Sequence, residues 1–137
     1  MWYLDNGDRT WGSGDQSFGF GLAGDTPLVG DWNGDGTDDV GVFRNGQFYL
    51  DKNGNRKWDT TDTFINKTFG NATDIPVSGD WNGDGKDEIG VLPALGTFYL
   101  DYNGDRKYNK ADGDLYSPFG AAEDKPVISD WNGDGEG

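Results

Sequence analysis

The chain of 137 residues carries 11 basic and 25 acidic side chains, so its net charge of −14 argues against nucleic acid and anionic membrane surfaces as partners. It contains no cysteine and no histidine, which excludes disulfides, cysteine-based zinc sites and histidine-dependent catalytic triads. The length favours a single domain, and the sequence has neither a long apolar run for a transmembrane helix nor the charged and then apolar start of a signal peptide.

The predicted elements, taken along the chain, follow a repeat. A six-residue string, Asp-Trp-Asn-Gly-Asp-Gly, begins at three positions, Asp31, Asp80 and Asp130. A second string, Phe-Tyr-Leu-Asp, occupies residues 48–51 and 98–101, and its partial copy Trp-Tyr-Leu-Asp occupies residues 2–5. The spacing of 49 to 50 residues predicts an architecture in which one unit cannot bury its core alone.

One repeat is expected to form four short strands and no long helix. From turn residues and β-branched or aromatic runs, the strands are predicted at Pro76–Asp80, Glu88–Leu92, Thr97–Leu100 and near Leu115–Phe119. Four strands in about 50 residues are typical of a propeller blade. The predicted fold is therefore all-β, with about three propeller-type blades.

The phase of the repeat divides this single repeat domain into two whole blades and two incomplete ones. The predicted boundaries are a partial blade at 1–26, blades at about 27–75 and 76–124, and a partial blade at 125–137. A closed propeller takes about 4–8 blades, so one chain is not expected to close a ring. The alternatives are a fragment, copies that complete one another's blades, or an open stacked assembly.

Each six-residue string opens a loop, here called a first-class loop, whose oxygens recur at alternate positions. Side chains at positions 1, 3, 5 and 9 and a carbonyl at position 7 match the first part of a calcium-binding EF-hand loop. The predicted ligands are Asp31, Asn33, Asp35, Thr37 and Asp39, repeated as Asp80, Asn82, Asp84, Lys86 and Glu88. The third copy offers Asp130, Asn132 and Asp134 but lacks position 9, so it is expected to bind poorly unless a neighbouring chain contributes.

A second-class loop follows the Phe-Tyr-Leu-Asp string and has the full EF-hand spacing, with Asp at position 12. The predicted ligands are Asp51, Asn53, Asn55, Lys57, Asp59 and Asp62, repeated as Asp101, Asn103, Asp105, Lys107, Asn109 and Asp112. The N-terminal copy has lost a residue, so that alignment on Asn6 puts Leu4 at position 1 while Asp8 and Asp15 keep positions 5 and 12. The two classes predict about four Ca²⁺ ions per chain; simple turns rich in Asn, Asp and Gly are the alternative.

Three tryptophans, Trp32, Trp81 and Trp131, occupy the second position of the first-class loops. An exposed row of indole rings would suit stacking on sugars, but packing between adjacent blades is the favoured interpretation. Asn66 and Asn71 match the N-glycosylation acceptor pattern, which matters only in a chain secreted by a glycosylating cell.

The segments 29–42 and 77–91 resemble FG-GAP/VCBS-type repeats, the calcium-binding blades of integrin-like β-propellers. The resemblance covers nearly the whole chain. It implies extracellular, calcium-stabilised blades of the kind found in adhesion, carbohydrate-binding or surface proteins. It assigns calcium-ligand roles to Asp31, Asn33, Asp35, Asp39, Asp80, Asn82, Asp84 and Glu88.

The expected function is that of an extracellular or cell-surface structural or adhesive module. Bound calcium would stabilise a small domain that has no disulfides, and copies of the chain would complete one another's blades in an oligomeric propeller or filament. The alternative is a carbohydrate-binding module, with glycans or cell-surface proteins as partners. An enzyme is not expected, because acid pairs such as Asp38/Asp39 and Asp59/Asp62 are explained as ligands or their neighbours.

Overall fold

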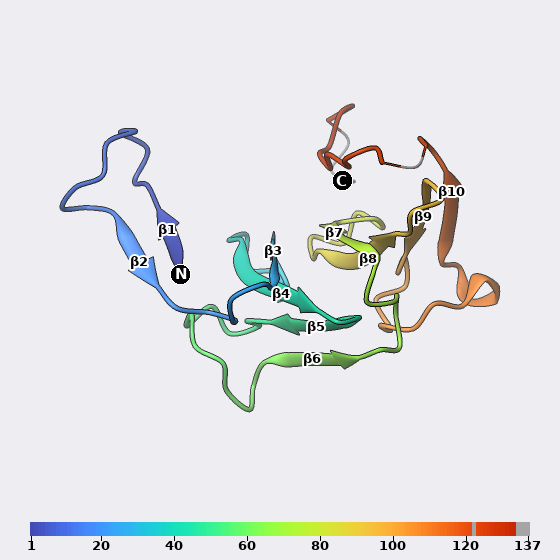
Figure 1. Ribbon diagram of the computed structural model, residues 1–137, viewed down its shortest axis with the longest axis horizontal. Coiled ribbons are helices and arrows are strands. Elements are labelled where there is room, and N and C mark those ends of the chain that lie inside the picture. The colour runs from blue at the N-terminus through green and yellow to red at the C-terminus, as the bar shows by residue number, and fades with distance from the viewer. Residues whose placement is uncertain (122, 134–137) are drawn as a thin grey trace.

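The computed structural model describes residues 1–121 and 123–133, which form three antiparallel sheets that follow one another along the chain (Figure 1). The N-terminal sheet pairs β1 (Trp2–Leu4) with β2 (Gln16–Phe18). The central sheet has the order β3 (Thr26–Gly30), β4 (Asp39–Arg44), β5 (Gln47–Leu50) and β6 (Thr63–Asn66). The C-terminal sheet pairs β7 (Ile75–Gly79), β8 (Glu88–Leu92), β9 (Thr97–Leu100) and β10 (Leu115–Pro118) in that order.

The all-β prediction is confirmed, as are the four strands predicted for the second repeat. The bounds of β8 and β9 agree with the prediction, and β7 and β10 differ by one residue. In the described part of the chain the three sheets do not close into a ring. The helical structure found there is a single 3-10 turn, η1 (Lys110–Asp112), and no described helix is long enough to cross a membrane.

Two apolar clusters join the sheets. The larger lies between the central and C-terminal sheets and contains Leu28, Trp32, Phe43, Phe48, Leu50, Ile65, Phe69, Ile89 and Val91. The smaller joins the N-terminal and central sheets and contains Phe20, Val40 and Val42, with Trp2, Phe18 and Tyr49 packed against it. The central sheet is therefore covered on both faces, so β4 is buried through almost its whole length although it is short.

The two junctions repeat the same aromatic contact. The Phe20 ring meets the edge of Trp58 at 6.4 Å between ring centroids, and the Phe69 ring meets Tyr108 in the same way at 6.1 Å. In both cases a Phe-Gly segment after one sheet contacts an aromatic ring in the second-class loop of the next sheet. Edge-to-face rings at this separation stabilise a contact beyond the area that they bury.

The tryptophans of the first-class loops pack inward in the two complete copies. Trp32 and Trp81 are each 6% exposed, and their indole N–H groups donate to the carbonyls of Val40 and Ile89. A Cβ added to Gly30 would lie 2.7 Å from the Trp32 ring and one added to Gly79 would lie 2.6 Å from the Trp81 ring, which explains the glycine before these two Asp-Trp pairs; the third pair follows Ser129. Both rings are buried, and Trp32 belongs to the cluster between the central and C-terminal sheets, whereas Trp131 is 78% exposed. Packing between propeller blades stays a prediction.

Candidate metal centres

The first-class loop between β7 and β8 brings three acids together. Oxygens of Asp80, Asp84 and Glu88 all lie within 4.8 Å of one another. Two oxygen ligands of one Ca²⁺ ion are at most about 5 Å apart, because each lies about 2.3–2.6 Å from the ion. The spacing predicted from the sequence therefore places these three side chains where a single cation can contact them all.

The backbone of this loop wraps around Asp80. One carboxylate oxygen of Asp80 accepts the N–H groups of Gly83 and Asp84 at 2.8 and 3.0 Å, and the other accepts that of Gly85 at 2.8 Å. Gly85 has a φ of 85°, which a side chain would strain. The glycine at position 6 thus allows the turn that orients the first carboxylate.

Glu88 is the acid of this loop whose ionised form the folded protein disfavours. Its carboxyl is 8% exposed, and burial raises its pKa to about 8, with the charges of Asp84, Asp80 and Asp101 adding to the effect. The backbone N–H of Trp81 donates to the Glu88 carboxylate at 3.1 Å and opposes this rise in pKa. A divalent cation would favour the ionised form, because it offsets both the burial and the repulsion.

The first-class loop between β3 and β4 is arranged differently around its last acid. Asp31 accepts four backbone N–H groups, from residues 33 to 36. Asp39 is buried, and its pKa rises to about 6 through burial and then through the charge of Asp51. The acids Asp31, Asp35 and Asp39 do not form one of the close groups found among the described residues. Asp39 is one methylene shorter than Glu88, and the Asn33 amide donates to it at 3.0 Å.

The asparagine at position 3 has a second role that the sequence did not reveal. The side-chain amides of Asn33 and Asn82 donate to the carbonyls of Lys52 and Tyr102, at 3.1 and 3.0 Å. Each carbonyl lies at the start of the second-class loop of the same sheet. The two loops of one repeat are therefore joined side by side, with Asp51 and Asp101 next to the buried acids of the first-class loops.

Asp87 is a further residue that the motif did not single out. Its carboxylate accepts the N–H of Asp31 at 2.8 Å, and its own N–H donates to the carbonyl of Asp31 at 2.9 Å. Ser78 adds a hydrogen bond to the Val29 carbonyl at 2.7 Å. These contacts fix one first-class loop to the next. The sequence shows an acid at position 8 of both loops, Asp38 and Asp87, but no local pattern indicates a contact between residues 56 apart.

Each second-class loop of the central and C-terminal sheets ends at an aspartate whose carboxylate accepts two backbone N–H groups of the same loop. The carboxylate of Asp62 accepts the N–H groups of Lys52 and Asp59 at 3.1 and 2.8 Å. In the next repeat the corresponding bonds run from Tyr102 and Asn109 to Asp114, at 3.1 and 2.6 Å. The structure thus places Asp114, and not the predicted Asp112, in the position of Asp62. Asp112 lies in η1, exposed, because this loop is two residues longer.

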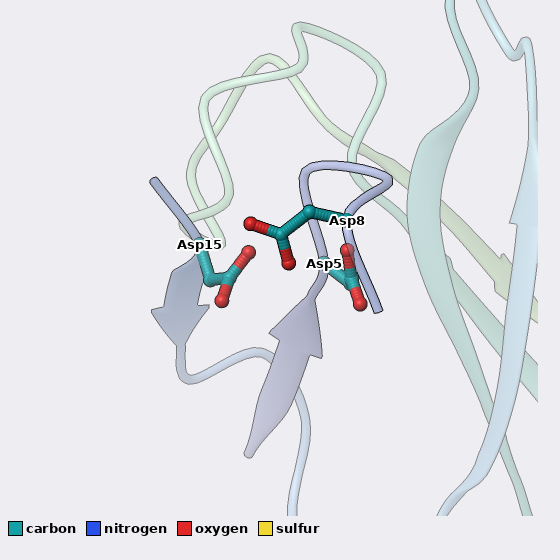
Figure 2. A group of neighbouring side chains, drawn as sticks. All are labelled: Asp5, Asp8 and Asp15. Atoms are coloured by element: carbon teal, nitrogen blue, oxygen red, sulfur yellow. The ribbon is translucent and has the colours of Figure 1, made fainter. Parts of the chain in front are cut away.

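The N-terminal copy forms the second close group of acids. Figure 2 shows the carboxylates of Asp5, Asp8 and Asp15 turned toward one another, and their ligand oxygens lie within 4.8 Å. Asp5 takes position 1, which sequence alignment gave to Leu4, because Asn6 supplies both the backbone N–H of position 2 and the side chain of position 3. Asp15 accepts the N–H groups of Asn6 and Gly12, as Asp62 does in its loop.

The remaining predicted ligands hold turns. The N–H groups at position 7 donate to the side-chain oxygen two residues earlier in four loops, at Thr37, Lys57, Lys86 and Lys107. Asn53, Asn55 and Thr61 surround Asp59, and these hydrogen bonds, led by that of Thr61, lower its pKa. Asn103 accepts the N–H of Asp105, and Asn109 caps η1.

The third first-class loop is described only in part. Asp130 and Asn132 are exposed, and the Gly133 N–H donates to Asp130 at 2.6 Å. The predicted ligand Asp134 lies outside the described residues.

Comparison with protein-family models, curated proteins and solved structures gave no match for this chain.

Proposed function

We propose that the chain is a calcium-stabilised repeat module with a structural or adhesive role, which associates head to tail with copies of itself outside the cell. The observation that carries the proposal is the aromatic junction made twice within the chain, both halves of which are also present uncovered on its surface. Calcium-binding modules of extracellular proteins bind the ion with low affinity, and a low affinity is what we expect of loops that are largely exposed to solvent.

The receiving half of the junction is uncovered at the C-terminal sheet. Phe119 occupies the position of Phe20 and Phe69 in the repeat, and it is 76% exposed. Beside it lies a hollow of about 490 Å³. Its apolar lining includes Trp81, Leu92, Phe98, Leu100 and Trp131. In the central sheet the corresponding surface is filled by the next repeat.

The inserting half is uncovered at the N-terminal sheet. Tyr3 and Trp11 form an edge-to-face pair at 5.3 Å and are 66% and 59% exposed. The same pair recurs as Tyr49 with Trp58, at 5.3 Å; there Tyr49 packs against the smaller apolar cluster, and Trp58 contacts Phe20 while staying 48% exposed. A second copy that placed its Trp11 against Phe119 would therefore repeat a contact that the chain already makes.

A contact between unlike faces generates a ring or a filament, according to whether its rotation closes. The N-terminal sheet has two described strands, and therefore no counterpart of Ile89 and Val91 on β8, which fill part of the internal junction. We expect the contact between copies to be weaker than the internal one. A net charge of −14 opposes association further, so calcium should favour it.

Light scattering with calcium and with a chelator tests the proposal. We expect calcium-dependent oligomers that Trp11→Ala and Phe119→Ala each abolish. Leu95→Ala, which removes a still more exposed apolar side chain outside the hollow, should have no effect. A mixture of the two defective variants keeps one intact pair of faces and should form dimers only. A monomer under all conditions would contradict the proposal, and a positive glycan array would then favour the carbohydrate-binding alternative.

A further inference from the structure

The second-class loops of the central and C-terminal sheets share a buried first carboxylate with only one oxygen paired, whereas the corresponding Asp5 is exposed and accepts the N–H groups of Gly7 and Arg9. The second oxygen of Asp51 accepts the N–H of Arg56 at 2.6 Å, and that of Asp101 accepts the N–H of Arg106 at 2.8 Å. Both arginines have a positive φ, 64° and 67°, which turns the backbone toward the carboxylate. One oxygen of each aspartate is thereby fixed and the other is left to face the loop.

That other oxygen has no hydrogen-bond partner among the described residues. Asp51 and Asp101 are 0% and 1% exposed, and the first oxygen, Oδ1, of each is buried and unpaired. These are the two buried side-chain atoms in the described part of the chain that lack a partner. An unpaired carboxylate oxygen in the interior is strongly unfavourable, and here it recurs at the same position of two repeats.

Other acids of the same loops act on these two carboxyl groups, although Asp101, Asp105 and Asp114 do not form one of the close groups of acids found among the described residues. The negative charge of Asp62 raises the pKa of Asp51, and the charges of Asp114 and Asp105 raise that of Asp101. The oxygens of Asp62 and Asp114 each accept one backbone N–H, which leaves a further lone pair on each. Each loop therefore holds a buried carboxylate oxygen without a hydrogen-bond partner, a closing aspartate with lone pairs to spare, and backbone N–H groups (of Gly54 and Asn55, or of Gly104) that lower the pKa of the buried acid without pairing with this oxygen.

We propose that the second-class loops form an independent set of divalent-cation sites, each with Asp51, Asp101 or Asp5 as the first ligand and Asp62, Asp114 or Asp15 as the closing ligand. The side chain at position 5 completes the oxygen set, as Asp8 does in the N-terminal copy, where the ligand atoms of Asp5, Asp8 and Asp15 lie within 4.8 Å (Figure 2). An all-oxygen, carboxylate-rich set suits a hard cation such as Ca²⁺. The inference requires neither assembly nor an occupied first-class loop.

The test is a calorimetric titration with calcium alone, in a background where Asp31→Asn and Asp80→Asn weaken the first-class loops. We expect this background to retain calcium binding. Asp114→Asn should remove one ion from the stoichiometry or weaken one site at least about tenfold, because the closing carboxylate is lost. Asp112→Asn is the matched control: it makes the same change two residues away in the same loop, at an exposed side chain, and should leave the titration unchanged.

Two further variants keep the proposal testable if Asp114→Asn fails to fold. Asp62→Asn makes the same change in the preceding repeat, and Asp8→Asn changes an exposed acid outside both cores, so its effect on binding is separate from folding. The proposal is overturned if the background binds no calcium, or if the Asp114 and Asp112 variants titrate alike. Loss of binding through Asp31 and Asp80 alone would leave the proposed function standing and refute this inference.

Discussion

Replacing Glu88 by glutamine should change the stability of the protein in opposite directions with and without calcium. Glutamine keeps the shape of the side chain and an oxygen to accept the Trp81 N–H, but it carries no charge. Without calcium, the variant is relieved of a buried acid whose pKa is raised from 4.5 to about 8. With calcium, it lacks one of the three carboxylates that converge in the loop.

The magnitude follows from the pKa. At about 1.4 kcal/mol per pKa unit, a wild-type carboxyl held from 4.5 to about 8 lowers stability at pH 7 by about 3 kcal/mol. Allowing for residual solvation, we expect Glu88→Gln to raise the free energy of unfolding by about 1–3 kcal/mol in chelator, or Tm by about 3–10 °C. An ion present at about 100 times its Kd stabilises the wild type by about 2.7 kcal/mol, most of which the variant should lose.

Thermal unfolding followed by circular dichroism, in chelator and in calcium, measures both effects. Glu123→Gln is the control, because it makes the same chemical change at an exposed residue outside the loops. The reasoning is refuted if Glu88→Gln destabilises the calcium-free protein, or if calcium raises the Tm of variant and wild type equally.

Three other perturbations have expected outcomes. In chelator, Tm should fall as pH rises from about 4 to 8, because the pKa values of Asp39, Asp101 and Glu88 are higher in the folded than in the unfolded protein, and their protonated forms are lost over this range. A pH series of thermal melts measures this dependence, which calcium should weaken. A Tm that does not change with pH in chelator would contradict the burial argument. Phe69→Ala, at a side chain 1% exposed, should cost about 3–5 kcal/mol in urea unfolding, and a cost under about 1 kcal/mol would show that the junction is not a core. Arg44→Met breaks the paired contact with Asp25, both of whose hydrogen bonds are 2.6 Å; since this contact lowers the pKa of Asp25, its contribution is present above the unfolded value of 3.8 and is lost on acidification, so the wild-type and variant melting temperatures should converge at low pH.

The sequence was informative wherever a pattern is local and repeated. The strands of the second repeat could be placed within one residue because β-branched and aromatic runs such as 88–92 lie between loops of Asn, Asp and Gly. Packing was also the interpretation favoured for Trp32 and Trp81, and in the structure both are buried, each ring lying against the glycine that ends the preceding strand, Gly30 or Gly79. Whether the sheets form propeller blades was not decided by these patterns, because strand pattern specifies a sheet and not the way that sheets are arranged.

The details of the sites depended on insertions and on distant contacts. Counting twelve positions from Asp101 reaches Asp112, but the extra turn at η1 moves the closing role to Asp114. The N-terminal copy is one residue shorter, and Asn6 supplies the groups that two residues supply in the other copies. A sequence alignment assigns one residue to one position, so it could not show this. The bond between Asp87 and Asp31 joins residues 56 apart, so no local spacing could indicate it.

The paired hydrogen bonds between Asp87 and Asp31 also bear on how the repeats evolve in number. The two junctions share the edge-to-face aromatic contact, and in the described residues each apolar cluster joins sheets that are neighbours along the chain. Stability in such an array is approximately a sum of unit and nearest-neighbour contributions. Duplication of one whole unit would therefore create a new junction with no mismatched surface, so the length of the array can change in single steps while every existing contact is retained.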